Sequence, residues 1–165
     1  MQSKDLIGDN LQKSAARVLA HIEDMRAHAT VAPTSAGGCH TLWVLGHLAY
    51  IEGLVIHTFM LGRPNPLAHW EPLFDAGEPS GQVGDFPPFD EVLATCRAMR
   101  QSTIQLLDGF SEEGLDQASA RVPPGWADTF GTYRLCFQYV ADHGYMHRGH
   151  LADARRAANL AHMWV

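Results

Sequence analysis

Apolar residues recur at intervals of three and four along much of this chain, the spacing of helices that pack against other helices. The pattern is clearest from Leu11 to Ala29, where apolar positions step by 4, 3, 4, 3 and 4 residues. It predicts a first helix here, and similar spacing predicts another from about Pro88 to Gly109. No strong strand pattern of alternating residues accompanies them. The sequence therefore predicts an all-α protein.

Two further segments carry the signals that start and stop helices. Thr41 is placed to cap a helix that runs to about Leu61, where glycine and proline follow. Thr132 is placed to cap a last helix that extends to about Asn159. With the two segments above, this makes four helices.

The residues from 64 to 88 are rich in proline and glycine and keep no sustained period. They predict a long loop between the second and third helices, with one short helical turn near Trp70 to Phe74. The four helices around it predict an antiparallel bundle, and the interior of such a bundle is where metal and cofactor sites are built. At 165 residues, the chain is expected to form a single domain over residues 1–165.

Composition narrows the classes of partner. The chain has 12 Lys and Arg against 18 Asp and Glu, a formal net charge of −6. A field of this sign repels phosphate backbones and anionic lipid, so we expect neither a nucleic-acid nor a membrane partner. The three cysteines form no CxxC pair, which favours the cytoplasm over an oxidising compartment.

The second helix is apolar around most of its circumference. It approaches the length of a membrane span, but it carries His47, Glu52 and His57, which are unfavourable in hydrocarbon. We therefore expect a buried bundle helix, and a surface this apolar favours a homodimer.

Histidine is the anomaly of the composition, with ten residues in the chain. His143, His147 and His150 occupy successive positions on the inward stripe of the last helix. Residues four apart lie one turn apart on the same face, so His143 and His147 can direct two imidazoles at one metal ion. Catalytic zinc-type sites commonly use three protein ligands. His47, on the stripe of the second helix, is the candidate for the third.

Alternatives remain open for each of these residues. Histidines on an apolar stripe can be hydrogen-bonded core residues that hold no metal. His150 is expected to support the site from behind or to line the cavity, because three ligands from one straight helix rarely converge. Tyr139 and Trp43 each lie one turn before a candidate ligand and are placed to line the cavity, although both also fit a plain aromatic core.

The segments Gly46–Glu52 and Asp142–Leu151 together resemble the DinB family, which has one histidine midway along its second helix and an HxxxHRGQ segment in its last. The resemblance implies an up-down-down-up four-helix bundle, frequently dimeric, with zinc or nickel held by three histidines. Carried over, those ligands are His47, His143 and His147. This chain departs from the pattern at His150, where glutamine is usual.

Related members are S-transferases that use bacillithiol, mycothiol or glutathione, and a mycothiol-dependent maleylpyruvate isomerase. The resemblance therefore implies a metal-dependent enzyme that activates a low-molecular-weight thiol, or water, for transfer to or hydrolysis of a small molecule. The alternative is a metal-binding stress or regulatory protein without turnover. A third interpretation is a metal-free bundle whose core histidines are hydrogen-bonded.

Overall fold

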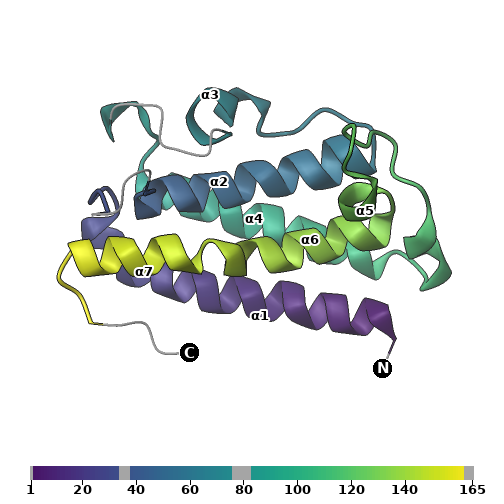
Figure 1. The fold of residues 1–165 in the computed structure, drawn as a ribbon, viewed down its shortest axis with the longest axis horizontal. Coiled ribbons are helices and arrows are strands. Elements are labelled where there is room, and N and C mark those ends of the chain that lie inside the picture. The colour runs from purple at the N-terminus through teal and green to yellow at the C-terminus, as the bar shows by residue number, and fades with distance from the viewer. Residues whose placement is uncertain (1, 34–37, 76–82, 162–165) are drawn as a thin grey trace.

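The computed structural model describes residues 2–33, 38–75 and 83–161, and its long helices lie side by side (Figure 1). Two of the helical segments change character part-way along. The long segments are α1 (Ser3–Asp24), α2 (Thr41–Gly53) with its continuation η2 (Leu54–Met60), α4 (Phe89–Asp108), and α6 (Tyr133–Met146) with its continuation α7 (Arg148–Ala157). The α1 helix packs along α6, and α2 packs along α4. The described residues contain no strand, only an isolated bridge between Ala118 and Thr132, so the all-α prediction is confirmed.

Short helical turns occupy the connections. They are η1 (Arg26–His28), η3 (Ala68–Trp70), α3 (Glu71–Phe74), η4 (Val83–Asp85), η5 (Glu113–Asp116) and α5 (Ala127–Phe130). The turn predicted near Trp70 to Phe74 is present as η3 and α3. The rest of the predicted loop includes residues 76–82, which lie outside the described residues.

The first helix begins eight residues before the predicted start, at Ser3 rather than Leu11. Asp5 accepts a hydrogen bond from the Gln2 backbone N–H, which satisfies one of the donors that a helix start leaves open. The backbone N–H of Lys4 donates to Glu112 at 3.0 Å. Ile7 is buried on the same stripe as Leu11, so the core continues toward the N-terminus.

Two sequence predictions about the other helices need correction. The cap of α2 is His40, whose Nδ1 accepts from the backbone N–H of Trp43 at 3.1 Å, and Thr41 is the first helical residue. The last helix is interrupted at His147, between α6 and α7. Gly144 and Gly149 flank this point, and glycine has the lowest helix propensity after proline. The cap at Thr132 is confirmed, because its hydroxyl accepts from the backbone N–H of Leu135.

The α2 helix forms the centre of the core. Almost all of its residues are buried. By length and composition alone, the segment Thr41–Met60 could cross a membrane, and 72% of its most apolar window is buried inside the chain. Within one chain, α1, α4, α6 and α7 pack against α2 and cover its apolar side chains. This packing explains why the helix is apolar.

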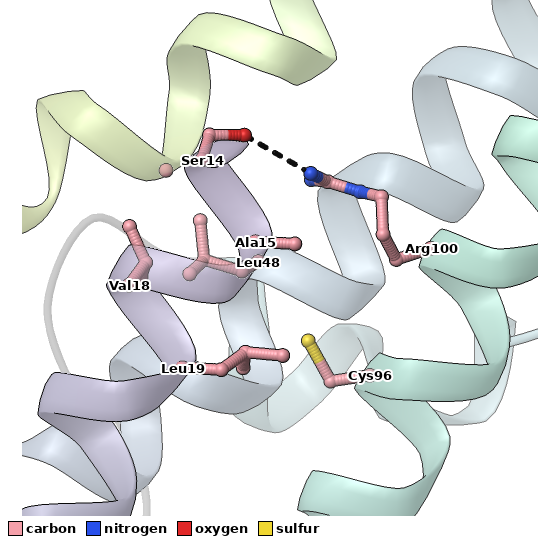
Figure 2. Close-up of a pocket in the computed structure, with 8 residues that line it drawn as sticks. Ser14, Ala15, Val18, Leu19, Leu48, Cys96 and Arg100 are labelled. Atoms are coloured by element: carbon pink, nitrogen blue, oxygen red, sulfur yellow. Dashed lines mark hydrogen bonds between the residues drawn. The ribbon is translucent and has the colours of Figure 1, made fainter. Parts of the chain in front are cut away.

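A part-buried guanidinium connects the long helices. Arg100 on α4 donates from Nε to both carboxylate oxygens of Glu52 on α2, each at 3.0 Å. It also donates to the Leu11 carbonyl and the Ser14 hydroxyl of α1, and to the Val140 carbonyl of α6. Figure 2 shows the Ser14 contact beside a cavity of about 20 Å³ between α1, α2, α4 and α6. One side chain therefore contacts the other three long segments.

Cys96 borders the same cavity, and burial raises the pKa of its thiol to about 12. It is therefore a small apolar core residue rather than a nucleophile.

We expect Arg100→Met to lower the free energy of unfolding by about 3–5 kcal/mol, because it leaves the Glu52 carboxylate buried without its partner. The double variant Arg100→Met, Glu52→Leu should regain part of that loss, since it removes both charges. Urea unfolding of the three proteins measures both effects. If Arg100→Met is as stable as the parent chain, the ion pair between Arg100 and Glu52 does not stabilise the fold as proposed.

Candidate metal centre

His47 lies near the middle of α2 and is held by a backbone group from a distant part of the chain. Its Nδ1–H donates to the carbonyl oxygen of Phe74, at the end of α3, at 2.6 Å. A carbonyl can only accept, so the proton is on Nδ1, and Nε2 presents its lone pair. Gly46 makes this contact possible, because a Cβ at that position would overlap the Phe74 ring.

His143 and His147 come together from α6 and its end. Their Nε2 atoms lie 3.1 Å apart, and each residue is buried. One ring nitrogen from each of His47, His143 and His147 lies within 4.8 Å of the others. The three histidines singled out from the sequence therefore form a single cluster between α2 and the junction of α6 and α7.

His150 lies behind the cluster rather than in it. Its Nδ1 is 3.1 Å from Nδ1 of His147. When His147 donates from Nδ1 to His150, its Nε2 presents a lone pair to the cluster, 3.1 Å from Nε2 of His143. His150 is only partly buried and is outside the group of three.

Trp43 and Tyr139 each lie flat against one of the clustered rings. Trp43 stacks on His47 with ring centroids 4.4 Å apart, and Tyr139 stacks on His143 at 5.3 Å. The indole N–H of Trp43 is buried and has no acceptor among the described residues. Both aromatic residues therefore border the cluster, where the sequence had placed them.

Burial keeps the three imidazoles uncharged. Burial, reinforced by His147 and His47, lowers the pKa of His143 to about 2. Burial and the neighbouring His47 and His150 lower the pKa of His147 to about 3. The pKa of His47 is also lowered by burial, against the opposing effect of its bond to Phe74. Neutral imidazole is the form that binds metal ions.

The donor set fits a divalent cation of the zinc type. Two nitrogens on a tetrahedral zinc ion with bonds of about 2.0 Å lie roughly 3.3 Å apart, close to the 3.1 Å between the paired Nε2 atoms. Metal-bound histidines usually have their second nitrogen bonded to a carbonyl or another acceptor. His47 and His147 already have such partners in Phe74 and His150.

Comparison with known proteins places this arrangement in a family. The model of the DinB superfamily matches residues 10–151. The chain belongs to the DinB superfamily. Its structure is similar to the crystal structure of a conserved protein from Enterococcus faecalis, with a TM-score of 0.62 and 18% sequence identity over 95% of this chain and 97% of that one. At this identity, the likeness concerns the fold alone. A search of curated proteins found no match.

DinB membership and the buried cluster together fit metal binding. Sequence reasoning missed one part of the site, the Phe74 carbonyl. A backbone group has no side-chain signature, and the only local signal was the glycine at position 46, directly before His47. His40 was also missed as the cap of α2, because the cap was expected at Thr41.

We expect Gly46→Ala to lower the free energy of unfolding by about 1–3 kcal/mol, because the added methyl group must displace the Phe74 ring. Gly149→Ala is the matched control: a Cβ there meets nothing within 4 Å, and alanine favours the helix by about 0.5–1 kcal/mol. Thermal or urea unfolding distinguishes the two. Equal effects at both positions would show that the contact at Gly46 does not constrain the site.

The metal-free DinB protein should lose stability as the pH falls below about 6.5. The unfolded chain protonates its histidines there, whereas His143 and His147 stay neutral in the folded chain until about pH 2–3. Protons therefore favour the unfolded state through this window. We measure the melting temperature in chelator from pH 7 to 5. It should fall less steeply for the double variant His143→Gln, His147→Gln than for the parent chain. Parallel slopes would contradict the assignment.

Proposed function

We propose that this DinB protein binds one divalent cation, zinc or nickel, through His47, His143 and His147. The observation that carries the proposal is the convergence of three buried neutral imidazoles, two of them already oriented through their second nitrogens. Imidazole suits both metals. Three ligands leave at least one coordination position for a further molecule.

We propose further that the site is catalytic and acts on a low-molecular-weight thiol, as an S-transferase, or on water, as a hydrolase. A divalent cation in such a site lowers the pKa of a bound thiol or water, so that a nucleophile exists near neutral pH. The chain's own contribution is to hold the ligand rings: Phe74 fixes the tautomer of His47, and the contact with His150 orients the ring of His147. Burial keeps bulk water from these contacts.

The alternative is a metal-binding stress or regulatory protein without turnover. The apolar groove described below favours an enzyme over this alternative. A purely structural or storage site needs no adjoining cavity. The proposal includes the arrangement that the family implies: a cytoplasmic homodimer of single-domain chains, each an up-down-down-up bundle with a long loop after its second helix.

Elemental analysis of the untagged protein tests the metal site. We expect about one equivalent of zinc or nickel per chain, lost almost completely in His47→Ala and His147→Ala, with the helical circular dichroism retained. His69→Ala is the matched control, since His69 is exposed and outside the cluster. His150→Gln should keep the metal. Metal content that is unchanged in His47→Ala would overturn the ligand assignment.

A screen of thiols against small electrophiles tests catalysis. Metal-loaded protein should accelerate transfer of the thiol or hydrolysis of the electrophile, and His47→Ala should remove that rate. A protein that binds its metal but accelerates neither reaction would favour the regulatory alternative.

A further inference from the structure

An apolar groove of about 230 Å³ lies next to Tyr139, the residue that stacks on His143. Its walls come from α2, η2, the segment before α5, α5 itself and α6. They carry no charged side chain, and apart from Tyr139 and the Trp126 indole their side chains are hydrocarbon. The lining residues are Ile51, Leu54, Val55, Phe59, Pro123, Trp126, Phe130 and Tyr139. Such walls favour an uncharged, apolar occupant.

The groove and the cluster share a wall. Tyr139 lines the groove, while its ring stacks on His143. On α2, the groove residue Ile51 follows His47 by four residues, which is about one helical turn. The Tyr139 ring is therefore in contact with both a molecule in the groove and the proposed metal ligand His143.

The backbone that forms one wall is unusual. The η2 segment, Leu54–Met60, is a π-helix, and the backbone N–H of Leu61 donates to the carbonyl of Ile56, five residues back, at 3.2 Å. π-Helical turns are rare and occur frequently at functional sites. This segment supplies Leu54, Val55 and Phe59 to the groove.

A half-exposed tryptophan completes the aromatic wall. Trp126 is 51% exposed and stacks on Phe130 with ring centroids 5.7 Å apart. Phe130 in turn meets Tyr139 edge to face at 4.8 Å. The chain turns into this segment at Gly125, whose φ of 84° is in the region that favours glycine. Aromatic contacts thus run from Trp126 to His143.

We propose that this groove binds the aromatic or other apolar part of a small uncharged substrate, the electrophile on which the histidine site acts. The inference rests on the proposed function. The volume decides the class of occupant: pockets for drug-sized ligands measure roughly 300–1,000 Å³, so this groove takes a molecule of one or two rings. A stable protein interface needs about 800 Å² on each partner, far more than one short groove supplies.

Calorimetric titration with 2-naphthol, a neutral two-ring probe, tests binding. We expect saturable binding to the full chain that Trp126→Ala weakens about fivefold or more, because a stacking surface is lost. Leu54→Arg should abolish it by placing a charge in the groove. Leu6→Ala is the matched control, since Leu6 is 48% exposed and does not line the groove. No binding, or equal loss in the control, would overturn the proposal.

Cobalt(II) added to the histidine site tests whether the groove serves that site. Bound Co²⁺ should speed the proton relaxation of 2-naphthol in the parent chain and not in His47→Ala. Calorimetric binding of 2-naphthol to the parent chain should be the same with and without Co²⁺, since none of the three histidines lines the groove. Co²⁺ that binds without relaxing the probe would overturn the substrate role.

Two further outcomes distinguish a failure of the proposed function from a failure of the groove proposal. If the chain binds no Co²⁺, the proposed function fails, and with it the substrate role of the groove, while the calorimetry still reports on the groove as a binding site. If sedimentation shows a dimer that Trp126→Ala dissociates, the groove is an interface between two chains, and the proposal is overturned.

Discussion

The structure is built around the burial of three imidazoles between α2 and the junction of α6 and α7. An imidazole in a core must be neutral and must find partners for its nitrogens, or it costs the fold roughly 1–3 kcal/mol. The chain supplies those partners from elsewhere: a carbonyl from α3 for His47 and a ring from α7 for His147. The site thus depends on two partners from other elements, α3 and α7, and the absence of a side chain at Gly46 leaves room for the Phe74 ring.

The pairing of helices that brings the imidazoles together has its own support in Arg100. Its guanidinium reaches α1, α2 and α6 from α4, which fixes how far each helix can slide along its neighbours. The same positive charge helps to lower the pKa of His143. A shift of the bundle that weakened the Glu52 pair would therefore also disturb the cluster, since Glu52 and His47 lie on one helix.

Much of this could be predicted from the sequence, because periodicity records which face of a helix is buried. The spacing of His143 and His147 already placed two rings on one face, and the stripe of α2 presented His47 to them. Two features could not be predicted. The interruption at His147 lies between Gly144 and Gly149, but the apolar period continues through it, so the period alone does not mark the break. The Phe74 carbonyl is a backbone group at the end of the short helix α3, where neither period nor side chain indicates a contact with residue 47.

The two stacked aromatics show why burial alone does not decide between core and function. Trp43 is fully buried and packs against the face of the His47 ring, while the Phe74 carbonyl accepts from the Nδ1–H of that ring. Tyr139 makes the same kind of contact with His143, but it also borders the apolar groove. The cluster is therefore closed by protein on one side and separated from a cavity by a single ring on the other. If the site acts on a small molecule, the groove beside Tyr139 is the side from which that molecule would approach the cluster.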